Sequence, residues 1–418
     1  MKNRLTPRQL AFRWASLATV VVVAVTAAIS IGSRGSAKTS TSNTSAIAAP
    51  GASTSTSAPA GPANIYAENQ APLARIAGDR RLVYVPNGKS NTVDVIDPTT
   101  LTIVNSFPTG GDPQHIVPSY DLRTLWVLDN AGDSLIPIDP STATPGTPIP
   151  VVDPYNLYFT PDGNEAIIVA ERFARLDFRD PHTMALHSSL VVHGCDGINH
   201  ADYSGDGRYM IVTCEFAGKL AKIDMVNRRV VGFLSLAAEP GADIAAMTTP
   251  SGNHTMAMPQ DVRTGPDGYH FYVADMLNGG VHVVDGDRFV ELMFIRTGVG
   301  AHGLTPSHDG TQLYVANRGS PMIAAPSKGK GSVSVVDVAT NTVTATWTVP
   351  GGGSPDMGNI TADGSQLWLS GRFDGEVYVF DLVHHRFQTR IPVGKGPHGL
   401  TLWPLAGRYS LGHTGNMR

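Results

Sequence analysis

Four histidines stand at two adjacent positions of a phrase that recurs along the chain. The phrase opens with Gly, Asp, Ser or Met, often followed by Pro. Polar residues or His come next, then a stretch in which apolar and polar residues alternate, and usually Asp-Gly. Imidazole nitrogens are ligands for copper, zinc and iron. A fold that arranges the phrases about one axis would therefore bring the four imidazoles together. These are His115, His200, His302 and His398.

Two residue columns emerge when the phrases are aligned on the residue after the opening one. Neighbouring residues of a strand face opposite ways, so we expect one column to face the axis in each unit, or both where the strand begins irregularly. We expect the polar residues of both columns to bind the ligand. Gly303, Met357 and Gly399, which also stand in the second column, are not included. The columns are Gln114, Tyr155, Asn199, Gln260, His302, Asp356 and His398, and then His115, Asn156, His200, Asp261, Gly303, Met357 and Gly399.

Two interpretations of the columns stay open. In one, the four histidines bind a metal ion, with copper or zinc as candidates, beside Asp261 or Asp356. In the other, the His and Asn side chains cap loops by hydrogen bonding to the backbone and bind no metal. A His-x-Met-x-Met run from His254 to Met258 leads into the second column, and it is either a soft ligand set for Cu(I) or a loop whose methionines pack on the surface.

The spacing of the phrases predicts the fold. Successive copies lie 41, 44, 61, 42, 54 and 42 residues apart. Units of this length with four short strands are typical of a β-propeller, in which each sheet buries its faces against its neighbours. An aspartate ends the third strand of every unit, where its carboxylate can accept turn N–H groups. The seven are Asp97, Asp139, Asp180, Asp224, Asp285, Asp337 and Asp381.

The chain is therefore predicted to be all-β, a seven-bladed propeller with four-stranded antiparallel blades. The phrase occurs once more at 397–404, after the seventh aspartate, and a weaker match at 72–79 precedes the first full strand set. We expect 397–404 to pair with the strand at 82–85, because this would close the ring and remove an exposed edge. An eight-bladed ring is the alternative.

Short tyrosine-containing stretches carry a family resemblance. YVAN at 314–317, YVAD at 272–275 and YVPN at 84–87 stand where the YVTN family of β-propellers has its namesake residues. The chain resembles YncE-like proteins of that family from about residue 70 to its end. The resemblance implies the propeller but not an activity, since the family and its relatives include binding proteins, surface proteins and cofactor enzymes. The related nitrous oxide reductase propeller has histidines at one end of its channel, but this chain lacks that protein's paired histidines and copper domain.

Composition narrows the classes of function. The chain has 31 Lys and Arg against 35 Asp and Glu, a net charge of −4, so no basic field favours nucleic acid as a partner. Only 16% of residues are charged, while 44 Gly and 30 Pro suit many strands joined by turns. A phosphate loop, a Gly-x-Ser-x-Gly elbow, a Cys-x-x-Cys-His and a His-Glu-x-x-His are absent from the sequence, so no catalytic residue is assigned.

The two cysteines occupy the ends of adjacent predicted strands. Cys195 precedes the first strand of one blade and Cys214 ends the next strand of the same blade. Antiparallel pairing brings such ends together, so a disulfide is geometrically feasible, and it would suit an oxidising compartment. Two unpaired thiols remain the alternative.

The N-terminal region differs from the rest in composition. Residues 1–13 contain four basic residues and no acidic one, and residues 14–32 are apolar and uncharged. Nineteen helical residues span about 28 Å, close to the thickness of a bilayer core, so 14–32 is predicted to be an apolar helix, either a transmembrane anchor or a signal peptide. Residues 33–64, rich in Ser, Thr, Ala and Pro, are expected to be a disordered tether, and 65–418 the propeller.

These features together predict an extracytoplasmic protein of the bacterial cell envelope, membrane-anchored, periplasmic or secreted. Its expected role is to bind a small molecule, a metal ion or a partner protein at the channel mouth. The alternatives are a metal- or cofactor-dependent oxidoreductase that uses the mouth histidines and a lactonase-like hydrolase. A binding role is expected in preference to catalysis.

Overall fold

The computed structural model describes residues 64–65, 74–240 and 255–417. These residues belong to one compact unit, 59–418. The predicted basic segment, the apolar run 14–32 and nearly all of the predicted tether lie outside the described residues. Within the described ranges, no helix has the length and apolar character needed to cross a membrane.

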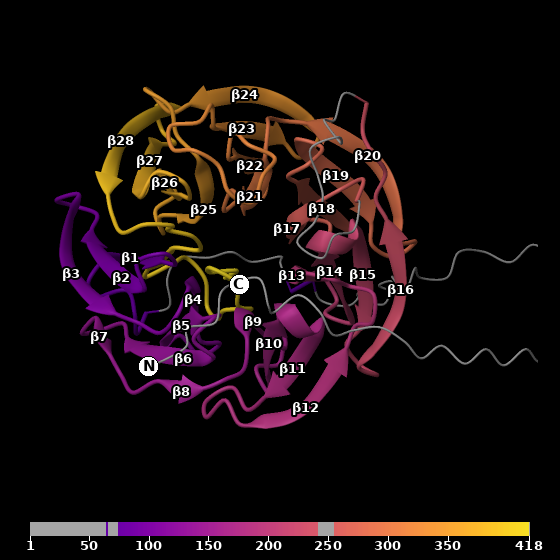
Figure 1. The fold of residues 1–418 in the computed structure, drawn as a ribbon, viewed down its shortest axis with the longest axis horizontal. Coiled ribbons are helices and arrows are strands. Elements are labelled where there is room, and N and C mark those ends of the chain that lie inside the picture. The colour runs from indigo at the N-terminus through magenta and orange to yellow at the C-terminus, as the bar shows by residue number, and fades with distance from the viewer. Residues whose placement is uncertain (1–63, 66–73, 241–254, 418) are drawn as a thin grey trace, which may run out of the picture. The chain divides into compact units, whose positions relative to one another are not determined.

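Seven antiparallel sheets surround a common axis, which confirms the seven-bladed propeller (Figure 1). We number the blades from the sheet that contains β1. From the axis outward, blades one to three are β29 (Thr401–Trp403), β1 (Leu82–Asn87), β2 (Thr92–Asp97) and β3 (Thr102–Pro108); β4 (Pro113–Pro118), β5 (Leu125–Asp129), β6 (Ser134–Asp139), β7 (Thr144–Pro145) and β8 (Ile149–Pro150); and β9 (Pro154–Phe159), β10 (Ala166–Ala170), β11 (Arg175–Arg179) and β12 (Leu186–Val191).

The remaining four blades follow the same order. They are β13 (Ile198–Tyr203), β14 (Tyr209–Cys214), β15 (Lys219–Asp224) and β16 (Arg229–Ser235); β17 (Pro259–Thr264), β18 (His270–Asp275), β19 (Gly280–Asp285) and β20 (Val290–Arg296); β21 (Ala301–Pro306), β22 (Gln312–Asn317), β23 (Ser332–Asp337) and β24 (Thr342–Thr348); and β25 (Pro355–Ile360), β26 (Gln366–Gly371), β27 (Glu376–Asp381) and β28 (Arg386–Pro392). Two short 3-10 helices, η1 (Glu171–Phe173) and η2 (Glu215–Ala217), follow β10 and β14.

The C-terminal phrase closes the ring as predicted. Strand β29 pairs with β1, with Trp403 opposite Leu82 and Thr401 opposite Tyr84. The indole Nε1 of Trp403 also donates a hydrogen bond of 2.9 Å to Asp79. The first blade therefore combines strands from both ends of the propeller, and its inner edge is covered.

Burial falls from the axis outward. Every residue of the innermost strands β9 and β13 is buried, because these strands are covered on both faces by neighbouring blades. The outermost strands β16 and β24 alternate between partly buried and exposed residues, since one face packs on the adjacent sheet and the other meets solvent. In blade two the outer strand is split into β7 and β8, where prolines at 145, 148 and 150 cannot donate ladder hydrogen bonds.

The seven strand-closing aspartates stabilise turns. Oδ1 of Asp97 accepts the backbone N–H of Thr99 at 2.8 Å, and Oδ1 of Asp381 accepts that of Val383 at 3.0 Å. Hydrogen bonds from the turn lower the pKa of both carboxyls. The aspartates thus have the structural role that their turn positions predict.

The backbone conformation of the opening residue explains why the phrase often begins with Gly or Asp. Five of these residues have positive φ, a conformation that Gly adopts without strain and Asp tolerates. A Cβ on Gly300 would lie 2.1 Å from the carbonyl oxygen of Ser320. The five are Asp112 (φ 54°), Asp153 (53°), Gly197 (68°), Gly300 (74°) and Gly396 (66°).

Cys195 and Cys214 form a disulfide in blade four. Their Cα atoms lie 4.7 Å apart, although 19 residues separate them in sequence. Both are fully buried among the apolar residues between blades three and four, including Ile198 and Val212. The bond ties the start of the innermost strand to the end of the next one.

Candidate functional site

Both residue columns reach the channel at the mouth, which we define as the end where the innermost strands begin. In blade four the pairing of β13 with β14 shifts between Ile198 and Ala201. Asn199 and His200 therefore both lie opposite one residue of β14, Thr213. The same shift occurs at the start of β17, β21 and β25. A bulge of this kind re-aims side chains, so neighbouring residues can both point toward the axis.

Three of the four predicted histidines form a compact group. Potential ligand atoms of His115, His200 and His398 all lie within 4.8 Å of one another, and all three side chains are buried. The ring centroid of His115 lies 4.7 Å from that of His398 and 5.3 Å from that of His200. The three residues come from blades two, four and one, so the fold brings them together across the axis. We call them the three-histidine group.

The nitrogens of this group are largely without hydrogen bonds. Neither nitrogen of His115, nor Nε2 of His200, has a partner among the described residues. Nδ1 of His200 lies 3.0 Å from Nδ2 of Asn156, which holds the ring in place. Buried polar atoms in native proteins are nearly always hydrogen-bonded, so these orphaned nitrogens require an explanation.

Asp356 orients the histidines on its side of the channel. Its Oδ2 lies 2.6 Å from Nδ1 of His398, and its Oδ1 lies 2.8 Å from Nε of Arg318 and 2.9 Å from Nδ1 of His302. A carboxylate on Nδ1 fixes the tautomer and leaves Nε2 available as a ligand. His302 does not belong to the three-histidine group. Its ring packs 5.5 Å from that of His398 and 6.2 Å from that of His200.

A fifth histidine, His413, enters the channel from the C-terminal tail. Its Nε2 lies 3.1 Å from Oδ1 of Asp261, and its Nδ1 lies 3.0 Å from Nη2 of Arg263. With His200 and Asp261 it forms a second set of atoms within 4.8 Å of one another. The repeat alignment missed His413 because it follows the last copy of the phrase, and only the path of the tail places it at the axis.

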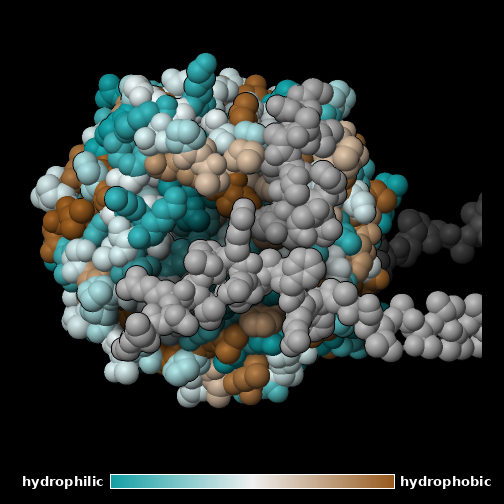
Figure 2. Space-filling view, viewed as in Figure 1, coloured by the Kyte–Doolittle hydropathy of each residue, from teal (hydrophilic) through white to brown (hydrophobic). Residues whose placement is uncertain are grey.

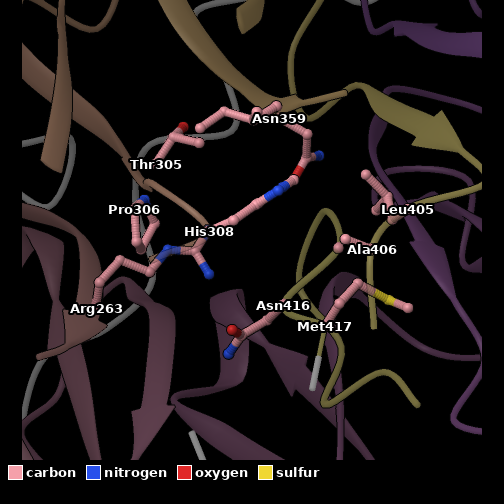
Figure 3. A pocket seen from close by; sticks show the side chains of 11 residues that line it. Arg263, Thr305, Pro306, His308, Asn359, Leu405, Ala406, Asn416 and Met417 are labelled. Carbon is pink, nitrogen blue, oxygen red and sulfur yellow. The ribbon is translucent and has the colours of Figure 1, made fainter. Parts of the chain in front are cut away.

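The tail occupies the end of the channel away from the mouth, near the centre of the ring (Figure 1). The backbone N–H of His413 donates to the carbonyl of Leu157 at 2.7 Å, and Nδ2 of Asn416 donates to Asp202 at 2.9 Å. Figure 3 shows Arg263, Asn359 and Asn416 around a pocket at this end, where the innermost strands β17, β21 and β25 meet the tail. The tail therefore fills this end and carries its own imidazole to the histidines.

Burial keeps the central imidazoles neutral. It lowers the pKa values of His115, His200 and His413 well below the ordinary value, and the positive charge of Arg263 lowers that of His413 further. Burial likewise lowers the pKa of His398 to about 3 and that of His302 to about 4, although Asp356 opposes the effect. Neutral imidazole is the form that ligates metal ions.

A third column at the mouth was missed because it follows the second strand of each blade. We call it the mouth rim. First-column residues contact it: Nδ2 of Asn199 donates to Glu215 at 2.7 Å, and Nη1 of Arg372 donates to Gln114 at 3.4 Å. An alignment on the second strands would have found its charged members. The rim residues are Gly88, Asn130, Glu171, Glu215, Met276, Arg318 and Arg372.

The other predicted mouth residues have varied surroundings. Tyr155 is buried against the rings of His115 and His200, at centroid distances of 5.3 and 5.7 Å. Nε2 of Gln260 donates to the carbonyl of Met258 at 3.3 Å. Met258 packs with Met276 and Leu277 in a small apolar cluster, and His254 lies outside the described residues. Packing therefore accounts for Met258, the last residue of the His-x-Met-x-Met run.

A further group of potential ligands lies in blade five. His282 is within 3.0 Å of Asp275 and 2.6 Å of Glu291, and Glu239 lies nearby. Burial alone would lower the pKa of His282, but the hydrogen bonds to these two carboxylates raise it to about 9. His282 is therefore a cation between two carboxylates, an arrangement that satisfies both of its nitrogens without a metal.

Comparison with known proteins agrees with the fold. The model of the YNCE-like beta-propeller family matches residues 43–186 and 241–408. A functionally unknown protein from Desulfotomaculum acetoxidans is similar in structure, with a TM-score of 0.59 and 14% identity over 77% of this chain and 98% of that one. A putative 6-phosphogluconolactonase from Bacteroides uniformis has a TM-score of 0.57 and 16% identity over 78% and 100%.

The hydrazine synthase of Kuenenia stuttgartiensis is also similar, with a TM-score of 0.54 and 19% identity over 69% of this chain and 88% of that one. No curated protein matches the sequence. At these identities the structural likenesses show the fold alone. The family model, in contrast, matches most of the chain, so the protein belongs to the YNCE-like beta-propeller family.

Proposed function

We propose that the propeller is a binding module that holds a transition-metal ion at its channel mouth through the three-histidine group. The observation that carries the proposal is the set of orphaned nitrogens on His115 and His200, fully buried beside His398. A buried polar atom without a partner costs roughly 1–3 kcal/mol. A metal ion bonded to these nitrogens would remove that cost, whereas loop caps would already have their hydrogen bonds.

The donor set suits zinc or copper. Three neutral imidazoles are ligands that both metals accept, and a site with three protein ligands leaves a position for water or for a bound molecule. Asp356 would hold His398 with Nε2 directed at the metal. If Nε2 of His200 binds the metal, the proton of this imidazole lies on Nδ1. The side-chain amide of Asn156 would then turn so that its oxygen accepts a hydrogen bond from Nδ1.

We also propose that the propeller acts outside the cytoplasm. Four basic residues before the apolar run 14–32 favour a cytoplasmic N-terminus and an exported C-terminal domain. The disulfide between Cys195 and Cys214 supports the same conclusion, because such bonds persist in oxidising compartments. Protease added to intact cells should degrade the propeller, and full protection would contradict export.

Metal analysis of the purified full-length protein tests the binding role. After chelation and reloading with Zn²⁺ or Cu²⁺, we expect one tightly bound ion per chain and at least a tenfold loss of affinity in His115→Ala. His187→Ala is the matched control, since that imidazole is 46% exposed on the outer strand β12. A wild-type protein that binds neither metal, or a His115→Ala variant with unchanged affinity, would show that the histidines have only a structural role.

A further inference from the structure

The mouth rim has its charges divided between two sides. Its acidic members, Glu171 and Glu215, follow the second strands of blades three and four. Its basic members, Arg318 and Arg372, follow the second strands of blades six and seven. In a seven-bladed ring these two pairs lie nearly opposite each other, as the positions of β10 and β14 and of β22 and β26 show (Figure 1). The rim therefore carries two carboxyls on one wall and two guanidinium groups on the other.

Contacts with the protein hold the basic side in place. Nε of Arg318 donates to Asp356, and its Nη1 lies 3.5 Å from the Met276 sulfur, a weak acceptor. Arg372 is half-buried, and the only hydrogen bond of its side chain among the described residues is the 3.4 Å contact with Gln114. Both guanidinium groups thus have donors left over, and a guanidinium fork suits a carboxylate.

The acidic side is also built into the fold. Glu215 is buried and accepts a hydrogen bond from Asn199, while Glu171 is half-buried in η1. Burial, together with the nearby charge of Glu215, raises the pKa of Glu171 well above its ordinary value. Two neighbouring carboxyls that repel each other would be stabilised in their charged form by a bound cation.

Tyr155 adds a hydrogen-bonding group to the mouth. The residue as a whole is 7% exposed, but its hydroxyl is not one of the buried polar atoms that lack a partner, and it makes no hydrogen bond with a described residue. An accessible hydroxyl without a protein partner can donate a hydrogen bond to a polar ligand or accept one from it. Figure 2 shows hydrophilic side chains around a hollow near the centre of this face.

We propose that the mouth rim binds a small ammonium–carboxylate zwitterion, with its carboxylate on Arg318 and Arg372 and its ammonium group on Glu171 and Glu215. A simple anion or cation would pair with one side and leave the other uncompensated, whereas a zwitterion pairs with both. Free amino acids and short peptides with both termini free share this chemistry. The inference deepens the proposed binding role and rests on it for the location of the site, but it does not require a metal.

Titration calorimetry of the metal-free full-length protein tests the proposal. The probes are glycine, β-alanine, γ-aminobutyrate, ε-aminocaproate and dialanine, which differ in charge separation, with propionate and propylamine as single-charge analogues. We expect one of the zwitterions to bind at least tenfold more tightly than either analogue. The preferred member distinguishes an amino acid from a peptide. Equal affinity for the zwitterions and the single-charge analogues would overturn the inference.

Rim variants locate the binding. Arg372→Gln and Glu171→Gln should each weaken zwitterion binding at least tenfold, while Arg372→Lys, which keeps the charge, should weaken it less. Arg386→Gln, 70% exposed on the outer strand β28, and Glu165→Gln, in the turn before β10, are the matched controls. A loss of binding that is no larger in Arg372→Gln than in Arg386→Gln would contradict the proposed site.

The two proposals fail in different ways. His115→Ala should weaken metal binding at least tenfold and leave zwitterion binding in the metal-free protein intact. Zwitterion binding that needs the metal and survives Arg372→Gln would overturn the rim site alone. A protein that binds the zwitterion but neither Zn²⁺ nor Cu²⁺ would overturn the metal site alone.

Discussion

Nδ1 of His398 lies 2.6 Å from Oδ2 of Asp356, and both side chains are buried at the centre of the mouth. His398 comes from the segment that closes blade one, and Asp356 comes from the innermost strand of blade seven. The same carboxylate accepts a hydrogen bond from Arg318 of blade six. Asp356 therefore connects the three-histidine group with the mouth rim.

Asp356→Asn should weaken metal binding by about 10- to 100-fold, because His398 would lose the carboxylate that orients it. It should also lower the free energy of unfolding by about 3 kcal/mol, since Arg318 would be left as a buried cation without its partner. Calorimetry with Zn²⁺ and urea unfolding measure the two effects. Wild-type metal affinity in this variant would show that Asp356 does not position a ligand.

Single histidine variants distinguish the two histidine groups. His398 belongs only to the three-histidine group, His413 only to the set with Asp261, and His200 to both. If the three-histidine group holds the metal, His398→Ala and His200→Ala should lose it while His413→Ala keeps it. The reverse result for His398 and His413 would assign the metal to the site supplied by the tail.

The stability of the protein should decrease at alkaline pH because of His282. Its pKa in the folded protein is about 9, above the unfolded value of 6.5. Its contribution is therefore fully present below pH 6.5 and is lost as the pH rises through 9, for a total of about 3 kcal/mol. Urea unfolding between pH 6 and 10 measures this, and His282→Gln should flatten the profile. An equally steep profile in the variant would assign the loss to other groups.

Ring closure should depend on Trp403. This indole is 1% exposed, lies on β29 and donates to Asp79, so Trp403→Ala should cost about 3–5 kcal/mol of unfolding free energy. Val226→Ala, at a side chain that is 73% exposed, should change stability by less than about 0.5 kcal/mol. A Trp403→Ala protein that unfolds at the wild-type urea concentration would mean that the closing strand contributes little.

Removing the disulfide should destabilise the oxidised protein. Replacing Cys195 and Cys214 with alanine opens a loop that spans 19 residues, and a loop of this length corresponds to about 3 kcal/mol in the chain-entropy description. A reducing agent should lower the melting temperature of the wild type and leave the double variant unchanged. If reduction has no effect on the wild type, the bond contributes nothing to stability.

The sequence alone determined the architecture, because the features that encode it are local and repeated. Each blade needs its own alternating strands, its own turn and its own Asp at the end of the third strand, so Asp97 and Asp381 recur with the period of the fold. The closing segment could be predicted for the same reason, since 397–404 is a further copy of the phrase. The histidine columns followed from the same alignment.

The tertiary structure decided which side chains meet. The bulges at the start of the innermost strands turn both columns toward the axis, and no residue pattern marked them. His413 reaches the histidines only because the tail runs back into the channel, and Glu171 and Arg372 lie on opposite sides of the mouth only because their blades lie on opposite sides of the ring. The repeated sequence pattern reflects the packing of each blade. A site on the axis depends instead on contacts between residues that are far apart in the chain. These contacts leave no repeating signal in the sequence.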